Sequence, residues 1–359
     1  MVQITDLHIK DQDNMSYKDN IVLITKYNNE NHMDGNVGKK DCEKILQRFG
    51  WKELASRLNP SIYNRHSIIY YLDWIKRTIL MCKDIENIEP STIVMIHPVI
   101  MPQKLQFLLR RSLNKHKLCL LVFDIDAWRG GPYWYNDRAW LNQADILIVH
   151  NEKMAKHLRE TGIDHPSIVS MGIIDYLADI PTDRNMVFQR SVAFAGNLQK
   201  SKFLPAWVNL SRNYDINLYG IGWNAHSHIK RVTYHGSFPA SELPSLMTGG
   251  FGLVWDGDSN HTETGPMGNY NRYNHPHKFS LYIASGMPVM VWSQAAVADV
   301  VRKYDIGFCI DSLDDINDIM NDLSEERYKE LCDHIKPLQK DIISGKFLES
   351  AVKEALKFL

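Results

Sequence analysis

Short apolar runs rich in β-branched residues recur along this chain, separated in most places by segments with the composition of helices. In the first half these runs are IVLITKY (21–27), STIVMIHP (91–98), LCLLVFDID (118–126), ADILIVHN (144–151) and SIVSMGIID (167–175). Such runs are typical of strands buried on both faces, and their alternation with helices predicts a parallel sheet. We expect helices over 41–54, ending near Gly50, and over 152–162, ended by Gly162.

A second series of the same kind follows and predicts a second α/β domain. Its strands are SVAFAGN (191–197), INLYGIG (216–222), RVTYHG (231–236), FGLVWD (251–256), PVMVW (288–292) and IGFCI (306–310), with a helix around 277–285. The segment LADIPTDRN (177–185) lacks apolar periodicity and reads as the linker. We therefore predict Rossmann-like domains over 1–176 and 177–340 that face a central cleft. A final helix over 341–359 is expected to pack back on the first domain.

Composition excludes several classes of protein. Lys plus Arg number 41 against 42 for Asp plus Glu, which argues against a general nucleic-acid binder. The five cysteines include no Cys-x-x-Cys pair, so a reduced, cytoplasmic setting is expected. The polar N-terminus has no apolar signal core, and no apolar run approaches the length of a membrane span.

The strongest local signal is AFAGNLQKSK (193–202), where a predicted strand ends in Gly196 and Asn197 and is followed by Lys200. A glycine turn lets the backbone approach a ligand, helix N-terminal amides favour an anion, and a lysine adds a positive charge. This pattern predicts a diphosphate site. A plain strand–turn–helix with solvated lysines is the alternative.

A second signal is YNHPHKFSLYIASGMPVMVW (273–292), which places Lys278 early in a helix that precedes a buried strand. Together with Lys200, Lys278 would neutralise the charge on a departing nucleotide diphosphate. An ordinary surface lysine is the alternative. His275 and His277 suggest a metal, but they have no Cys or paired carboxylate nearby, so we expect no metal site.

Acidic residues follow strands in both halves. Asp256 and Asp258 follow FGLVW and are candidates for contacts with sugar hydroxyls, or else loop caps. Asp124 and Asp126 end the strand 118–126, and Asp126 is our candidate general base, with a turn or N-cap aspartate as the alternative. Both pairs match Asp-x-Asp literally, which we interpret as incidental.

Two further features complete the first-domain side of the predicted cleft. His97 ends the strand 91–98 and is expected on the acceptor side, although a lone histidine is more often structural. The loop NHMDGNVGKK (31–40) contains Gly35 and Asn36, and its glycines allow a close approach of backbone to a ligand. It lacks the strict G-x-G-x-x-G spacing of a dinucleotide site.

Four segments carry a resemblance to a known family: AFAGNLQKSKF, PASELPSLMTGGFGLVW, YNHPHKFSLYIASGMPVMV and QADILIVHNEKMAKHLRETG. They resemble bacterial GT-B glycosyltransferases, above all the sugar transferases that extend the glycan on serine-rich repeat adhesins. A related branch contains galactofuranosyltransferases. The resemblance runs from about Ile21 to the C-terminus.

The resemblance implies a UDP-sugar site in the second domain, with Lys200 and Lys278 on the diphosphate and with Tyr219 and Ser237 near the uridine. It places the loop 34–38 and Asp126 where acceptor and donor sugar meet, and it suggests a homo-oligomer, a dimer or tetramer. Many retaining GT-B enzymes carry a Glu-x₇-Glu pair, whose positions correspond here to Tyr273 and Leu281. The segment 258–272 is longer than in relatives and is expected to be a mobile substrate loop.

The residue patterns and the resemblance together predict a metal-independent hexosyltransferase of GT-B architecture. The resemblance implies a UDP-sugar donor, with glucose preferred. It also implies an acceptor that is N-acetylglucosamine or glucose on a serine-rich repeat glycoprotein. Galactofuranosyl transfer in cell-surface polysaccharide synthesis and a non-catalytic partner of another transferase remain alternatives. An epimerase or dehydrogenase is a weaker alternative, because the first half lacks the glycine fingerprint and a Tyr-x-x-x-Lys pair.

Overall fold

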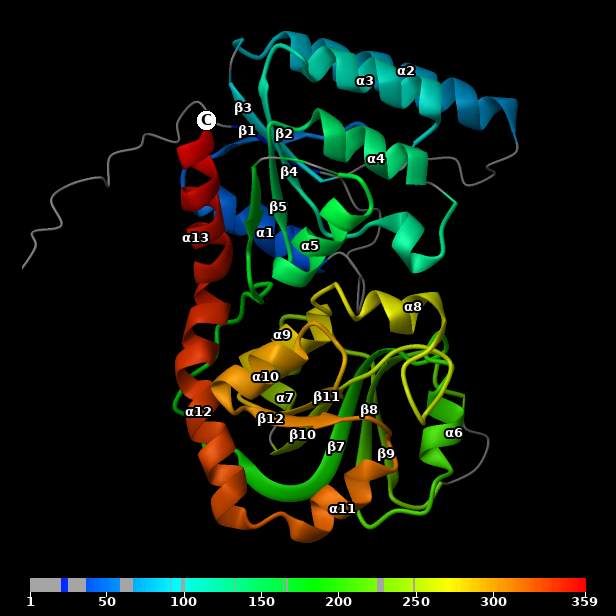
Figure 1. The fold of residues 1–359 in the computed structure, drawn as a ribbon, viewed down its shortest axis with the longest axis vertical. Helices are drawn as coiled ribbons and strands as arrows, with labels where there is room; N and C mark the ends of the chain where they lie inside the picture. The colour runs from blue at the N-terminus through cyan, green and yellow to red at the C-terminus, as the bar shows by residue number, and fades with distance from the viewer. Residues whose placement is uncertain are drawn as a thin grey trace, which may run out of the picture.

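The computed structural model describes residues 21–24, 37–58, 67–90, 92–97, 101–132, 134–163, 165, 167–224, 229–247 and 249–359. These residues form two α/β domains stacked along the long axis of the molecule, each built on a six-stranded sheet (Figure 1). Every strand pairing in both sheets is parallel. The predicted α/β fold with two Rossmann-like domains is confirmed.

The sheet of the first domain has the order β2-β1-β3-β4-β5-β6. Strand β5, between β4 and β6, is buried along its whole length, as expected of a parallel strand covered on both faces. The strands are β1 (Ile21–Ile24), β2 (Lys52–Ala55), β3 (Ile93–Ile96), β4 (Lys117–Leu121), β5 (Ile146–Val149) and β6 (Ile168–Ser170). The helices are α1 (Val37–Arg48), α2 (Ile68–Glu86), α3 (Gln103–Leu113), α4 (Trp134–Gln143) and α5 (Glu152–Glu160), with the 3₁₀ helix η2 (Asp126–Arg129).

The sheet of the second domain has the order β12-β11-β10-β7-β8-β9. Large aromatic side chains, among them Phe194, Trp207 and Trp255, fill its core. The strands are β7 (Val187–Asn197), β8 (Asp215–Ile221), β9 (Val232–Gly236), β10 (Gly249–Val254), β11 (Val289–Trp292) and β12 (Gly307–Ile310). The helices are α6 (Leu204–Val208), α7 (Leu243–Leu246), α8 (Gly265–Tyr270), α9 (His277–Ala284), α10 (Ala298–Tyr304) and α11 (Asp315–Asp322).

Two C-terminal helices join the domains along one side of the molecule (Figure 1). Helix α12 (Glu325–Ser344) packs against α9, and α13 (Lys346–Ala355) packs against α1, β5 and β6 of the first domain. Gly345 separates them with φ 91°, and a Cβ atom there would lie 2.6 Å from Ile45 Cγ1, so both the turn and the close approach require glycine. The buried Asp175 carboxylate accepts hydrogen bonds from the N–H groups of Phe347 and Leu348 at the start of α13.

Two predicted elements of the first domain need correction. The strand expected over 118–126 ends at Leu121, and Asp126 begins η2 instead. The helix expected to end near Gly50 is α1, which stops at Arg48, but the residues after the glycine form the unpredicted edge strand β2 (Lys52–Ala55). Gly50 has φ 83° and turns the chain out of the helix. Because β2 is mostly exposed, it has no apolar signature in the sequence.

Candidate functional site

The carboxyl ends of the two sheets meet at the junction of the domains. The backbone N–H of His275, just before α9, donates to Nδ1 of His150, which follows β5, at 3.0 Å. The N–H of Ile125, after β4, donates to the Tyr270 hydroxyl at 3.3 Å. Ligands of parallel α/β sheets bind at the carboxyl ends of the strands, so this junction is the candidate site.

The predicted glycine turn lies at the carboxyl end of β7. Gly196 and Asn197 are the last residues of that strand. The side-chain oxygen and the carbonyl of Asn197 both accept from the N–H of Lys200, at 3.1 and 3.2 Å. This turn fixes the backbone, while the side chain of Lys200 is exposed at the same sheet edge.

Lys278 is held at the centre of that edge. It is the second residue of α9 and is partly buried. Its Nζ donates to the carbonyl of Trp255, directly after β10, at 3.1 Å and lies 4.5 Å from the centre of the Phe194 ring on β7. A carbonyl and an aromatic face both stabilise an ammonium group. The side chain is therefore fixed between the ends of two adjacent strands.

Glu263 is a functional candidate that the sequence analysis missed. Its side chain is 2% exposed. One oxygen accepts from the N–H of Asp256 at 2.9 Å and the other from Nδ2 of Asn271 at 2.8 Å. Burial raises the pKa of Glu263 to about 8, against the opposing effect of these hydrogen bonds and of nearby Lys278. The site thus contains a buried carboxyl beside the predicted donor residues.

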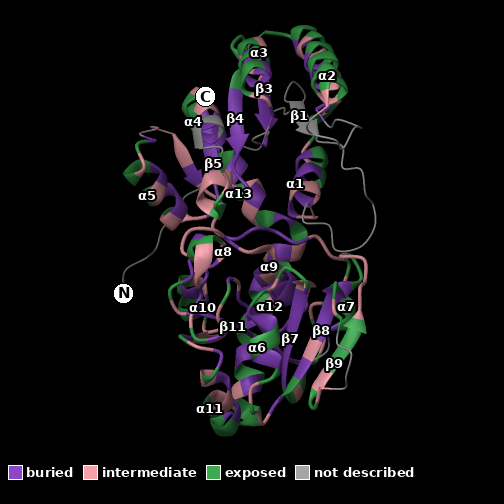
Figure 2. Ribbon diagram, turned by 90° about the vertical axis from the view of Figure 1, so that its right-hand side faces the viewer, coloured by how far each residue is buried: buried purple, intermediate pink, exposed green. Residues whose placement is uncertain are grey.

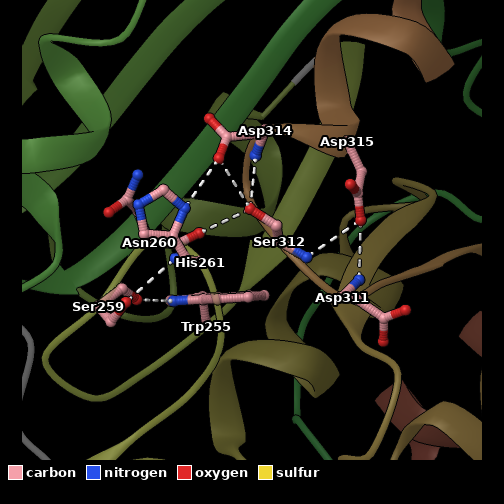
Figure 3. A network of polar contacts seen from close by, with 8 residues as sticks. All are labelled: Trp255, Ser259, Asn260, His261, Asp311, Ser312, Asp314 and Asp315. Carbon is pink, nitrogen blue, oxygen red and sulfur yellow. Dashed lines mark hydrogen bonds and ion pairs between the residues drawn. The ribbon is translucent and has the colours of Figure 1, made fainter.

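The loop that carries Asp256 and Glu263 is tied to the neighbouring β12–α11 connection (Figure 3). The carbonyl of Asn260 accepts from Oγ of Ser312 at 3.2 Å, and Nδ1 of His261 lies 3.0 Å from Oδ2 of Asp314. The segment 258–272, which we expected to be a mobile loop, also contains helix α8. These contacts place Asp256 on an anchored segment.

Of the two residues predicted near the uridine, Tyr219 lies on β8 and Ser237 comes directly after the edge strand β9 of the second sheet. Tyr219 on β8 stacks on His235 with ring centroids 4.6 Å apart, and with Phe238 and Met247 it lines a cavity of about 230 Å³. Whole-ligand sites are typically about 300–1,000 Å³, so this cavity suits only part of a ligand. Ser237 directly follows β9, and its buried hydroxyl has no partner among the described residues.

Asp126, the candidate base, begins η2, which packs against α8 of the second domain. Its carboxylate lies against the backbone of Gly131, where a Cβ atom would be 1.8 Å from Oδ2. That buried oxygen has no hydrogen-bond partner among the described residues. Asp124 is instead ion-paired with Arg129 at 3.0 Å. Because the strand ends at Leu121, the period-two relation expected between Asp124 and Asp126 does not apply.

His97 is buried directly after β3, while Gly35 and Asn36 lie outside the described residues. Its Nδ1 lies 3.2 Å from the carbonyl oxygen of Leu121. Burial, with a smaller effect of Lys39, lowers the pKa of His97 to about 3, so the ring is neutral. After the residues that contain Gly35 and Asn36, the structure describes the chain again from α1. Gly38 of α1 lies close to His277, since a Cβ atom added to Gly38 would be 3.0 Å from the His277 ring.

Three more neutral histidines line the junction, and only two of them were considered from the sequence. Burial lowers the pKa of His150 and of His277 to about 4, and that of His275 well below its usual value. Nε2 of each ring is buried without a partner among the described residues. Neutral imidazoles can donate to or accept from hydroxyl groups. Within the described chain, no group of three or more His, Cys, Asp or Glu side chains is arranged to hold a metal ion.

The positions that correspond to the Glu-x₇-Glu pair have structural roles. The ring of Tyr273 stacks on His157 of α5 with centroids 3.8 Å apart. Leu281 is 5% exposed and belongs to the core of the second domain. Neither position supplies a carboxylate, and the buried carboxyl near Lys278 comes from Glu263.

Comparison with known proteins accounts for both domains. Residues 21–173 match the N-terminal domain of the glucosyltransferase 3-like proteins, and residues 192–355 match their C-terminal domain. The chain belongs to the glucosyltransferase 3-like family. It is 32% identical to the β-1,6-galactofuranosyltransferase WbbI of Escherichia coli K12 over 68% of this chain and 72% of WbbI. It is 29% identical to glucosyltransferase 3 of Streptococcus gordonii over 70% of this chain and 75% of that protein.

Solved structures similar to this glucosyltransferase 3-like chain have the GT-B fold. AviGT4, a glycosyltransferase involved in avilamycin A biosynthesis, aligns over 94% of this chain and 97% of its own with a TM-score of 0.58 and 13% identity. Sucrose-phosphate synthase from Thermosynechococcus elongatus aligns over 94% and 97%, with a TM-score of 0.55 and 11% identity. The family match makes the chain a glycosyltransferase, and these structures show that it has the predicted GT-B architecture. None of its described helices combines the length and hydropathy needed to cross a bilayer.

Proposed function

We propose that this glycosyltransferase moves a hexose, with glucose preferred, from a UDP-sugar to a sugar acceptor. The acceptor would be N-acetylglucosamine or glucose on a serine-rich repeat glycoprotein. The main support is the fixed ammonium of Lys278 at the end of β7 and β10, held by the Trp255 carbonyl and the Phe194 ring. A partly buried cation at a strand end suits a diphosphate, because low local polarity strengthens its attraction for the leaving group.

Lys200 would supply a second positive charge, and Gly196 and Asn197 would supply the backbone turn beneath the phosphates. We propose that these groups replace a metal ion. The two Asp-x-Asp sequences each have one carboxylate already paired with a cation: Asp258 with Lys202 at 3.3 Å and Asp124 with Arg129 at 3.0 Å. Activity should therefore persist in excess EDTA.

The acceptor and the transferred sugar would bind at the domain junction. The unpartnered ring nitrogens of His150 from the first domain and of His275 and His277 from the second are suited to hydroxyl groups. We propose Asp126 as the base that takes the proton of the attacking hydroxyl, because its buried Oδ2 has no partner among the described residues. His97 would support this face through its contact with Phe123, at 5.3 Å between ring centroids.

Galactofuranosyl transfer is the second candidate function. It is favoured by the 32% identity to WbbI, against 29% for glucosyltransferase 3 of S. gordonii. The two donors differ in ring size and in the position of the exocyclic hydroxyls, which the histidines at the domain junction would face.

A direct test incubates the purified chain with UDP-glucose, UDP-galactose, UDP-N-acetylglucosamine or UDP-galactofuranose and glycosides of N-acetylglucosamine or glucose. Release of UDP and the mass of the product report transfer. We expect acceptor-dependent UDP release with one preferred donor, UDP-glucose first. Preference for UDP-galactofuranose would select the second function. Donor binding without transfer or hydrolysis would indicate a non-catalytic partner and contradict the proposal.

A further inference from the structure

Helix α2 exposes apolar side chains along a face that has no covering element among the described residues. Ile68, Leu72, Ile75 and Ile79 follow the spacing i, i+4, i+7, i+11 of one helix face and are 78%, 57%, 40% and 47% exposed. The opposite face, with Trp74 among its residues, is buried in the first-domain core. A surface helix normally has a polar outer face, so this outer face is adapted to contact something apolar.

Helix α3 packs beside α2 and extends the same surface, at the end of the first domain remote from the second (Figures 1 and 2). It exposes Phe107 and Leu108 by 60% and 44%. A groove of about 760 Å³ runs between the two helices, with Ile79, Leu108, Lys83 and Arg111 in its walls. We call the outer helical face the set Ile68, Ile69, Tyr71, Leu72, Ile75, Lys76, Ile79, Leu80, Lys83, Lys104, Phe107, Leu108 and Arg111, all exposed.

Positive charges outnumber negative ones on these two helices. Together α2 and α3 contain six Lys or Arg residues and three Asp or Glu residues. Two of the three carboxylates are paired: Asp73 with Arg77 at 2.8 Å, and Asp84 with Arg57. Glu86 is the third. The outer helical face therefore combines exposed apolar side chains with four cations, on a protein whose net charge is only −1.

We infer that the outer helical face binds the surface of an anionic lipid membrane. Apolar side chains that insert between acyl chains, surrounded by Lys and Arg that meet anionic headgroups, are the pattern of an interfacial helix. A large exposed apolar patch on a folded protein marks an interaction surface. The proposal does not depend on which sugar the protein transfers.

The same observations count against other occupants. A second copy packed on this face would bring four cations against four cations, which costs free energy. In a groove that binds a peptide helix, the apolar side chains line a concave surface that encloses the helix. Here Ile68 and Phe107 protrude, at 78% and 60% exposure, and the apolar surface extends over the outer side of α2 beyond the groove.

Vesicle co-sedimentation of the full chain tests the inference. Vesicles of phosphatidylcholine with 30% phosphatidylglycerol would be compared with pure phosphatidylcholine at low and physiological salt. One variant, Lys83→Gln/Arg111→Gln, removes two cations. A second, Ile68→Ser/Ile69→Ser/Leu72→Ser, removes exposed apolar area. The matched controls are Lys329→Gln/Lys340→Gln on α12 and Phe358→Ser, which change exposed residues elsewhere.

We expect salt-sensitive binding to the anionic vesicles and about 30-fold weaker binding for the double cation variant, since each cation near such a surface contributes about 1 kcal/mol. The serine variant should lose binding, and both controls should bind as the parent does. Circular dichroism of each variant confirms folding. The inference is overturned if the parent does not bind, if neutral vesicles bind it equally, or if the controls lose as much. It is also overturned if the outer-face substitutions only disperse a dimer seen by sedimentation velocity.

Discussion

Glu263 accepts a hydrogen bond from the backbone N–H of Asp256, with 2.9 Å between Oε1 and N. Its other oxygen accepts from Asn271, at the end of α8. A single buried carboxyl therefore joins the strand end beside Lys278 to the helix that contacts the first domain. This relationship links the conformation of the proposed donor site to the domain junction.

Replacing Glu263 should destabilise the second domain. Glu263→Ala leaves the Asp256 N–H and the Asn271 amide without their acceptor in a buried space, and we expect a loss of about 2–4 kcal/mol in the free energy of unfolding. Glu263→Gln retains one acceptor oxygen and should cost about 1 kcal/mol. Urea titration followed by tryptophan fluorescence measures both. Equal stability of the alanine variant and the parent would show that these hydrogen bonds do not hold the loop.

The buried histidines predict a loss of stability in acid. His150 has a pKa near 4 in the fold, compared with 6.5 unperturbed. The unfolded chain therefore binds more protons between these values, and stability falls as the pH drops from 6.5 to 4. Each pKa unit corresponds to about 1.4 kcal/mol, so His150 contributes up to about 3 kcal/mol of this loss.

His150→Asn should reduce that acid dependence, because its side-chain oxygen can still accept from the N–H of His275 but does not titrate. Urea midpoints of parent and variant between pH 4 and 7 measure the difference. The raised pKa of Glu263 has the opposite effect on stability. Its contribution to the free energy of unfolding is present in acid and is lost as the pH rises through about 8. The prediction would be contradicted if the urea midpoint of His150→Asn fell between pH 6.5 and 4 as much as that of the parent.

The attachment of α13 to the first domain should depend on Asp175. Its carboxylate accepts from the N–H groups of Phe347 and Leu348, the latter at 2.8 Å. Asp175→Ala removes this N-terminal acceptor and should cost about 1–3 kcal/mol. Amide exchange in 346–355 should accelerate, while Asp175→Asn, which keeps an acceptor oxygen, should change it less. Unaltered exchange in the alanine variant would mean that apolar packing alone holds the helix.

Asp126→Asn tests the proposed base. The substitution keeps the shape of the side chain beside Gly131 but removes its ability to take a proton. We expect kcat to fall at least about 100-fold with UDP affinity unchanged. Steady-state kinetics and UDP titration separate the two quantities. Retention of kcat, or an equal loss in UDP affinity, would remove Asp126 from this role.

Much of the fold is predictable because parallel strands that are buried on both faces have continuous apolar sequences. The runs at 144–151 and 288–292 correspond to β5 and β11. Helix α2 was not predicted, since Ile68 and Ile79 on its outer side are as apolar as Trp74 on its inner side and no amphipathic pattern results. The proposed contact with lipid explains why the outer side of α2 is apolar.

The candidate site was only partly predictable. Lys278 was found because it lies in a recognisable helix–strand segment, now α9 and β11. Glu263 was missed because its importance depends on how the segment 258–272 folds over Trp255, which the sequence does not indicate locally. The meeting of His150 with His275 is likewise a tertiary contact between residues 125 positions apart. The sequence shows only an acidic residue two positions before Gly265-Pro266, where α8 begins, and its burial is seen only in the structure.

Calorimetric titration of UDP into the parent chain and into Lys278→Ala tests the central claim most directly, with Lys329→Ala on α12 as the control. We predict that Lys278→Ala weakens UDP binding by about 10- to 100-fold, the effect of one charge-assisted contact, while the fold is retained by circular dichroism. The control should bind as the parent does. Unchanged UDP affinity in a folded Lys278→Ala protein would contradict the account.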